Sequence, residues 1–581
     1  MKHILTAVLA LSAIAPAASS ATHNPGALVH LTTRKWLTMD PADASDAVSF
    51  IVTGNVYESL ISFKELKVPF EYVPFLAAQV PTKANKLLSA DETVYRFPIR
   101  TGVTFHDGRP LTPEDVRYSI LRFMLKDTEG GSSGILLNPI LGVYSTRGAD
   151  GAIRVDFKEA EKAVAVDGGD VVIRLKRPNG HFLKIMASLP IIVSKPWAVS
   201  HGEWDGTEAS WKRHNNRPAS DSYLASHANG TGPFAVETAD PEKELVLKRN
   251  DKYWRAPAAL SKVYLRIVPS KAMRLWMLET GDADASFFED QDYSEVKDIP
   301  GVKIADSPHH TMLGEAVFFN FKPDAGADLG SGKLDGSGIP PDFFADRDVR
   351  DGFAHAIDYE GFLRRGMGMR GKRARGPFPD AFLPEQEPLP YEYDLAKAAA
   401  AFKRARGGEV WEKGFTATVS LSPSLLSRRI LAEFIKAGVE KVNPKFKVRI
   451  KSMPSEELYT AMEKRRLALF ITGFGADYPD PQSVASSILH SAGYFPQAQG
   501  YSNPELDGMI DAADAEADSP KLTRMYVEIG RKAAEDIAQI FTYNPTRFRA
   551  MRTWVRETDP RNNVNNLNLN THPYFYARAK D

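Results

Sequence analysis

The segment that most constrains the fold runs from Leu467 to Pro481, where an apolar stretch of strand length ends in two glycines and a carboxylate. The apolar stretch is typical of a buried β-strand, and Gly473 and Gly475 lack the side chains that would keep another backbone away. Asp477 follows where little water is expected, so its charge needs a partner. These residues indicate a place where an extended, positively charged molecule lies along the strand. The alternative is that Asp477 only caps the turn before a proline, and the residues alone favour neither.

Length and charge narrow the class of protein. The chain has 581 residues, too many for one hydrophobic core, so two or three domains are expected. The composition, 43% apolar and 25% charged, is ordinary for a soluble globular protein. Lys and Arg together number 73, as do Asp and Glu, so the formal net charge is zero. A nucleic-acid partner is therefore not expected, because it would need a basic surface.

The N-terminus has the pattern of a secretory signal. Lys2 precedes an apolar run from 4 to 15, and small residues follow as far as Ala21. We therefore predict a signal peptide over 1–21, removed on export. The chain has no cysteine, which excludes disulfides, zinc thiolate sites and thiol catalysis, and no lipid anchor is expected. A soluble exported protein without disulfides fits a bacterial periplasm.

Strand and helix patterns alternate irregularly along the chain, which predicts α/β or α+β domains. One helix start is clear, with Thr112 as the cap, Pro113 at the first helical position and two acidic residues in the first turn. Further segments have strand patterns (27–32, 245–250, 263–268 and 317–320) or helix patterns (47–60, 425–442 and 454–462).

Signatures of catalysis and metal binding are incomplete. The one Gly-x-Ser-x-Gly match, from Gly130 to Gly134, lies in a Gly/Ser-rich loop after a helix pattern, whereas a nucleophile elbow follows a strand. A dispersed triad is compatible with the sequence. Gly330-Ser-Gly-Lys333 fails the phosphate-loop pattern, because Leu334 stands where Ser or Thr is needed. His106-Asp107 has no further ligand at a suitable spacing and fits a hairpin turn. We therefore expect no catalytic residue, no metal and no cofactor.

An ordered series of short motifs points to a family. In sequence order the motifs are 55–58 (NVYE), 104–116 (TFHDGRPLTPEDV), 230–234 (GTGPF), 249–254 (RNDKYW), 281–284 (GDAD), 318–320 (FFN), 349–358 (VRDGFAHAID), 473–481 (GFGADYPDP) and 501–504 (YSNP). With these motifs in this order, the chain resembles the large periplasmic solute-binding proteins of ABC importers, family 5, which include dipeptide- and oligopeptide-binding proteins. The resemblance covers nearly the whole mature chain, and its specificity lies in the joint order of the motifs.

The resemblance implies a ligand site. In peptide-binding members, the Asp at the position of Asp477 pairs with the α-ammonium group of the ligand. The strand before it, here Gly473, Phe474, Gly475 and Ala476, hydrogen-bonds the peptide backbone. On the other lobe, the resemblance places ligand contacts around Ser45, Asp46 and Ala47. The position of a ligand-carboxylate anchor is not implied, since that anchor varies in the family.

The resemblance also implies the architecture and the function. The expected fold is a two-lobed periplasmic binding protein of the Venus-flytrap type (type II), with an extra inserted domain. We expect lobe I over 22–58, 190–310 and 545–581, the inserted domain over 59–189, and lobe II over 311–544. The expected function is capture of a peptide or similar amine-bearing solute by a monomer, for delivery to an inner-membrane ABC permease, with no catalysis. The alternatives are a metal chelate, opine or oligosaccharide as ligand, or, less favoured, a secreted hydrolase.

Overall fold

The structure is a computed structural model that describes residues 24–65, 70–148, 150–307, 312–423, 425–516, 519–558 and 574–580. The signal peptide predicted over 1–21 lies outside these residues. Within them, no helix is both long enough and apolar enough to span a lipid bilayer. We keep the names lobe I, inserted domain and lobe II for the three parts defined above. Their boundaries stay predictions.

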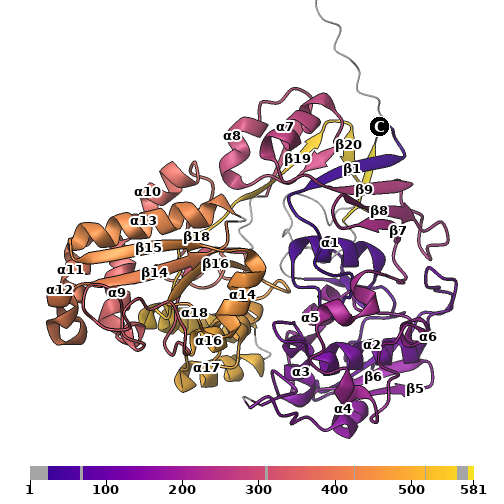
Figure 1. The fold of residues 1–581 in the computed structure, drawn as a ribbon. Coiled ribbons are helices and arrows are strands. Elements are labelled where there is room, and N and C mark those ends of the chain that lie inside the picture. Colours follow the sequence, from indigo (N-terminus) through magenta and orange to yellow (C-terminus); the bar gives the residue numbers. More distant parts are fainter. Residues whose placement is uncertain are drawn as a thin grey trace, which may run out of the picture.

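Lobe I is built on a seven-stranded mixed sheet in the order β11-β19-β10-β1-β9-β8-β7. Strand β1 pairs in parallel with β9 and β10. Strand β19, which comes from near the C-terminal end of the chain, pairs antiparallel with β10 and β11. Figure 1 shows this sheet at the top of the molecule, with α7 (Lys271–Thr280) and α8 (Tyr293–Val296) beside it. The strands are β1 (Ala27–Thr32), β7 (Phe234–Asp240), β8 (Glu244–Arg249), β9 (Lys262–Ile267), β10 (Ala285–Ser286), β11 (Val302–Ser307) and β19 (Arg547–Arg552).

Lobe II contains a five-stranded sheet in the order β15-β14-β16-β12-β17, with a hydrophobic core on each face. Leu469 and Ile471 of β16 belong to one core, and Phe470 between them belongs to the other. Phe470 stacks on Phe318 of β12 with ring centroids 5.1 Å apart. Because both faces of β16 are covered, its sequence is continuously apolar rather than alternating. The strands are β12 (Met312–Phe319), β14 (Phe415–Leu421), β15 (Phe446–Ser452), β16 (Leu469–Gly475) and β17 (Gln539–Ile540).

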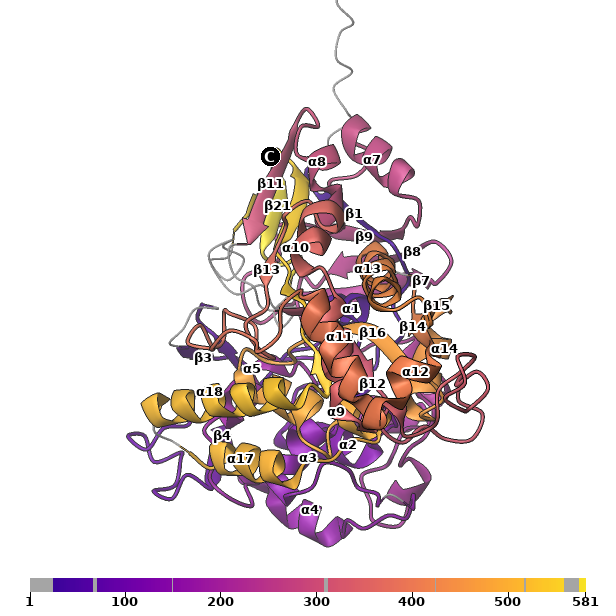
Figure 2. The same ribbon diagram turned by 90° about the vertical axis from the view of Figure 1, so that its left-hand side faces the viewer.

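Helices cover both faces of the lobe II sheet. One group packs on the core that contains Leu469, and the other packs on the core that contains Phe470. Figure 2 shows helices of both groups from the side of this lobe. The first group is α9 (Arg347–Ala356), α11 (Leu395–Arg404) and α13 (Leu426–Val442), and the second is α14 (Ser455–Glu463), α16 (Tyr494–Gln499), α17 (Pro504–Asp514) and α18 (Ser519–Asp536).

The inserted domain carries a three-stranded antiparallel sheet in the order β4-β6-β5 and a group of helices. The predicted helix start at Thr112 is confirmed. The Thr112 hydroxyl accepts the N–H of Asp115 at 3.2 Å, and the Asp115 carboxylate accepts the N–H of Thr112 at 2.9 Å. The elements are β2 (Ile61–Phe63), β3 (Tyr72–Pro74), β4 (Val94–Pro98), β5 (Val164–Asp167), β6 (Asp170–Arg174), α2 (Pro113–Lys126), α3 (Gly134–Leu141), α4 (Phe157–Ala163) and α5 (Phe182–Ser188).

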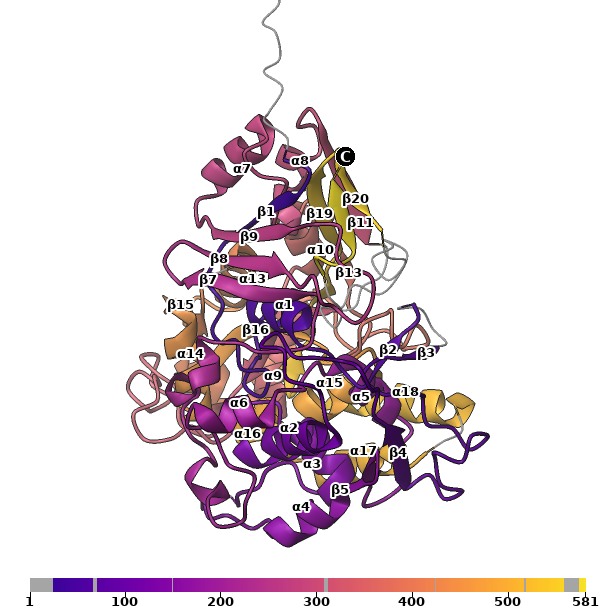
Figure 3. The same cartoon turned by 90° about the vertical axis from the view of Figure 1, so that its right-hand side faces the viewer.

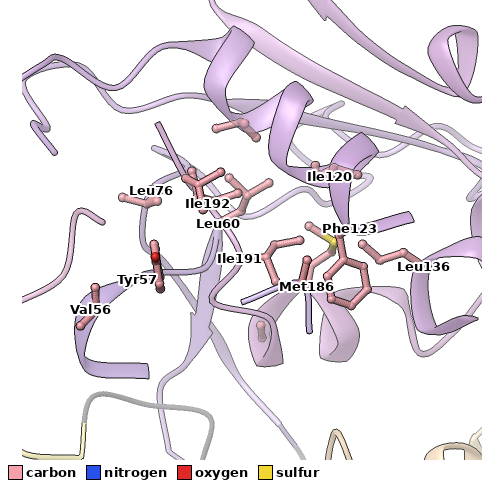
Figure 4. Close-up of a cluster of buried hydrophobic side chains, with 14 of the residues drawn as sticks. Val56, Tyr57, Leu60, Leu76, Ile120, Phe123, Leu136, Met186, Ile191 and Ile192 are labelled. Carbon is pink, nitrogen blue, oxygen red and sulfur yellow. The ribbon is translucent and has the colours of Figure 1, made fainter. Parts of the chain in front are cut away.

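Lobe I and the inserted domain share one continuous hydrophobic core. Figure 4 shows part of it, with Val56 of α1 (Ala47–Val56) on one side, side chains of α2, α3 and α5 on the other, and Ile191 between them. Figure 3 shows α1 and α2 beneath the seven-stranded sheet. The labelled members of the cluster are Val56, Tyr57, Leu60, Leu76, Ile120, Phe123, Leu136, Met186, Ile191 and Ile192. A core without a break indicates that the two parts move together.

A buried ion network adds to this connection. Arg122 of α2 donates to both carboxylate oxygens of Asp40 at 2.7 and 2.6 Å, and to Glu203 at 2.7 Å. Lys126, one helical turn later, pairs with Asp40 at 2.8 Å and also with Asp43. Since all five side chains are buried, removing one partner would leave another charge uncompensated.

The chain crosses between the lobes twice. It passes from β11 of lobe I to β12 of lobe II, and it returns from β18 (Tyr543–Asn544) to β19. β18 pairs with β13 (Lys372–Arg373), and β20 (Val555–Glu557) pairs with β21 (Arg578–Lys580). Near these crossings, Arg370 of lobe II pairs with Asp306 of lobe I at 2.7 Å. The lobes are therefore in contact on the side where the chain joins them.

Candidate functional site

Strand β16 leaves the core of lobe II as it runs toward Asp477. Its first four residues are buried, Gly473 and Phe474 are half-buried, and Gly475 is exposed. Along one edge, β12 pairs with β16 as far as Gly475, whereas β14 pairs with the other edge only from Leu469 to Ile471. In the part of the chain that the structure describes, no strand continues along that second edge. Its backbone groups are thus available to an extended guest, the arrangement by which peptide main chains add to sheets.

The two glycines of β16 differ in what surrounds them. Gly473 faces a bulge in β12, and a Cβ there would lie 3.4 Å from the carbonyl oxygens of Leu313 and Gly314. At Gly475 a Cβ would meet only Met312 Cε at 3.5 Å, an ordinary contact. Neither glycine has a positive φ angle. A Cβ at Gly473 would thus have more neighbours than one at Gly475, but all at ordinary distances, and nothing in the described chain requires glycine at either position.

Asp477 follows the strand in a tight turn. Its N–H donates to the hydroxyl of Ser483 at 2.9 Å. Its side chain is half-buried, and among the described residues no cation or hydrogen-bond donor contacts the carboxylate. Burial raises the pKa of Asp477 to about 7, because the charged form loses water and gains no counter-charge. The site therefore offers a carboxylate that a cationic guest would stabilise in its charged form.

A second carboxylate beside β16 is already neutralised. Glu315 is buried on β12, and its Oε2 would lie 3.5 Å from a Cβ at Gly473. Arg428 of α13 pairs with it at 3.0 Å, and the hydroxyl of Ser427 donates to it at 2.9 Å. A ligand cation near the end of β16 thus meets one free carboxylate, Asp477, rather than two.

Phe474 and Ala476, predicted to meet the ligand, also pack on lobe II itself. Both are half-buried against the core that contains Phe470. The ring of Phe474 stands edge-to-face to Phe495 with centroids 6.0 Å apart. These contacts hold the two side chains in place, and their role toward a ligand stays a prediction.

The predicted contacts on lobe I lie at the start of α1. Asp46 is its N-cap, and one carboxylate oxygen accepts the N–H groups of Val48 at 3.0 Å and Ser49 at 3.2 Å. Ser45 and Ala47 on either side are exposed. The cap explains Asp46 structurally, so its part in ligand binding, like that of its two neighbours, stays a prediction.

Sequence reasoning missed the contacts that reach this turn from elsewhere. Ser483 fixes the backbone of Asp477, and Asp480 contacts His181 and Lys184 of the inserted domain. Asp480 before Pro481 has the pattern of a helix N-cap followed by proline, a signal that was available. Its partners were not predictable, because Lys184 precedes Asp480 by 296 residues.

Metal binding has no support here, since no group of three or more His, Asp or Glu side chains in the described residues could hold an ion.

A family model decides the class of protein. Residues 71–496 match the bacterial extracellular solute-binding proteins, family 5, middle region. The chain belongs to this family. The match spans β16 and Asp477 and most of the inserted domain, so the lobe II part of the candidate site lies within the family's own sequence pattern.

Relatives and solved structures agree with the family and with the predicted fold. The glutathione-binding protein GsiB of Pectobacterium atrosepticum is 23% identical over 520 residues, 87% of this chain and 86% of the relative. The periplasmic binding protein DppA from Helicobacter pylori, in complex with the peptide STSA, has a TM-score of 0.74 at 20% identity and covers 96% of this chain and 98% of its own. AgaA from A. tumefaciens, in complex with agropinic acid, has a TM-score of 0.72 at 14% identity, and the match covers 96% of this chain and 99% of AgaA. The prediction of a two-lobed α/β binding-protein fold is confirmed.

Proposed function

We propose that this solute-binding protein captures peptides or similar amine-bearing solutes in the periplasm and delivers them to an inner-membrane ABC permease. One observation carries the proposal. Asp477, a half-buried carboxylate without a cation among the described residues, stands at the end of a strand whose edge is open beside it. A free α-ammonium group and an adjoining extended backbone are the two features of a peptide that such a site would recognise.

The proposed mode of binding assigns a task to each part of the site. The ligand ammonium pairs with Asp477, and the first peptide units add to the open edge at Gly473 and Gly475 as an extra strand. Residues around Asp46 on lobe I contact the ligand from the other side. No bond is made or broken, and the protein acts as a monomer. A ligand that touches both lobes stabilises the closed arrangement only through its higher affinity for that state.

The relatives support an amine-bearing ligand and leave its size open. Glutathione and the peptide STSA, bound by GsiB and DppA, both carry a free α-ammonium group. The structure of AgaA with agropinic acid shows that the same fold also holds an opine. Opines are therefore the second candidate class.

Mass spectrometry of ligand released from the purified protein tests the proposal. The protein is denatured and its bound ligand is identified, and calorimetry then compares trialanine, glutathione and N-acetyl-trialanine. We expect a released compound with a free amine and much weaker binding of the acetylated peptide. Release of a compound without an amine, or equal affinity for the free and acetylated peptides, would contradict the assignment to Asp477.

A further inference from the structure

Basic side chains of the inserted domain reach carboxylates of lobe II directly beside the candidate site. Nδ1 of His181 lies 3.1 Å from Oδ2 of Asp480, and Lys184 forms an ion pair with the same oxygen. Arg177 forms a further pair with Asp511 at 3.0 Å. These contacts join two parts of the molecule with separate sheets, so they form only while the inserted domain lies against lobe II.

The surroundings of Asp480 favour a persistent contact. The side chains of His181 and Asp480 are 0% and 4% exposed, and that of Lys184 is 22% exposed. Burial by itself would raise the pKa of Asp480, but the charges of His181 and Lys184 outweigh it and hold the pKa below its ordinary value. Salt screens a pair in such a position far less than a pair on the surface.

An apolar contact reinforces these polar ones. Tyr478, two residues before Asp480, is 3% exposed and belongs to the hydrophobic cluster of lobe I and the inserted domain. Its neighbours in the sequence belong to lobe II. The turn therefore places one aromatic ring and one carboxylate into the opposite part of the molecule.

The same turn carries the proposed ligand anchor. Oδ1 of Asp480 accepts the N–H of Gln482 at 2.9 Å and caps α15 (Pro481–Val484), while Ser483 on that helix accepts the N–H of Asp477. Residues 477–483 thus form one hydrogen-bonded unit. Displacing Asp480 would disturb the position of Asp477, and holding Asp480 would keep it in place.

We propose that Asp480, together with His181 and Lys184, is an interlobe clasp that stabilises the closed arrangement without a ligand. Because the inserted domain shares its core with lobe I, the clasp acts on both together. Ligand binding and the clasp then favour the same state, so the clasp also slows release of the ligand. The slower release of the ligand rests on the proposed function, whereas the stabilised closed arrangement does not.

Small-angle scattering of the ligand-free protein tests the clasp. Asp480→Asn removes the charge and keeps a side chain that caps α15, whereas Lys184→Gln removes the cation without altering the turn. Lys176→Gln is the matched control, because Lys176 pairs with Glu159 at 2.9 Å within the inserted domain and both are exposed. We expect a larger radius of gyration for the first two variants, no change for the control, and unchanged helix content by circular dichroism for all three.

The affinity for trialanine is measured on the same preparations. We expect the two clasp variants to bind it about three- to tenfold more weakly, mainly through faster release. An unchanged radius of gyration in both variants would overturn the clasp. Expansion in Asp480→Asn alone would overturn it as well, because Asp480 would then act only within its turn. Expansion in both variants without any binding of trialanine would support the clasp and refute the peptide ligand.

Discussion

At the scale of single residues, two carboxylates three positions apart have opposite electrostatic states. Asp480 forms an ion pair with Lys184 and has a lowered pKa, whereas Asp477 has no cationic partner among the described residues and a pKa of about 7. A half-buried carboxylate without a partner destabilises the protein that carries it. Its presence at the end of an open strand edge is explained if a ligand supplies the missing cation.

Replacing Asp477 by Asn is expected to abolish binding of free-amine peptides while leaving the fold intact. Loss of one partner of a buried charge pair costs roughly 3–5 kcal/mol, or at least about a hundredfold in affinity. The ligand-free variant should melt no lower than wild type, because an unpaired charge has been removed. Calorimetry and thermal melting measure both quantities, with Asp324→Asn as control, since Asp324 is half exposed and pairs with Arg465 elsewhere on lobe II. Retained affinity in the Asp477 variant would exclude it as the anchor.

Affinity for amine ligands is expected to fall as pH falls through about 7. The ligand-free pKa of Asp477 is near 7, and the ammonium binds the ionised form, so a protonated Asp477 must lose its proton on binding. Affinity should fall about tenfold per pH unit well below pH 7. Calorimetry from pH 5 to 7.5, in buffers of different ionisation enthalpy, measures the affinity and the released protons. Asp477→Asn is the control and should show no such dependence; a flat profile in wild type would contradict the anchor.

At the scale of elements, β16 has two environments along one strand. Its buried half is fixed by two cores and by strands on both edges. Among the described strands, its outer half has a neighbour on one edge only. A β-strand with one unpaired edge is a template for another chain. The open edge here is short and ends at a proline-containing turn, which suits a peptide ligand rather than a whole sheet.

Bulk at Gly475 is expected to block the ligand and not the fold. Gly475→Val should weaken peptide binding at least about tenfold by filling the space of the ligand backbone, and its melting temperature should stay close to wild type because only Met312 is near. Gly473→Ala is the comparison variant, and it should keep its melting temperature as well, because the nearest atoms would lie at an ordinary 3.4 Å from its Cβ. Loss of stability with full affinity in Gly475→Val would show instead that this glycine serves the strand alone.

At the scale of the whole molecule, the three largest sheets of the described residues belong to two bodies. The seven-stranded sheet and the inserted domain share a core, whereas the lobe II sheet lies between two cores that are largely its own. Two chain crossings join these bodies, and ion pairs bridge them both near the crossings and beside the candidate site. This arrangement permits hinge motion with little change inside each body.

Adding the true ligand is expected to reduce the radius of gyration, and the ligand should be recovered chemically unchanged. Moving the molecule from mostly open to mostly closed takes about 5.5 kcal/mol of preference for the closed state. A charge pair with Asp477 and several backbone hydrogen bonds can together supply a free-energy preference of this order. Scattering with and without ligand measures the change, and Asp477→Asn should not respond. Recovery of cleaved ligand, abolished by mutation near β16, would favour a hydrolase instead.

Much of the fold was predictable because its determinants are local. The continuously apolar run of β16 predicts a strand buried on both faces, and Thr112 with Pro113 predicts the start of α2. The ordered motifs predict the family, which the match over 71–496 shows. Asp477 was identifiable as a candidate because a carboxylate directly after a buried strand is unusual without a partner.

The sequence by itself therefore determined the family, the two-lobed class of fold and the position of the candidate anchor. Only the tertiary structure decided which edge of β16 is open, what surrounds each of its two glycines, and which carboxylates are paired. Arg428 neutralises Glu315, and Lys184 neutralises Asp480, across separations of 113 and 296 residues. Such pairings leave no local pattern, because charge and steric contact depend on distance in space, and that distance is set only when the sheets and lobes have packed.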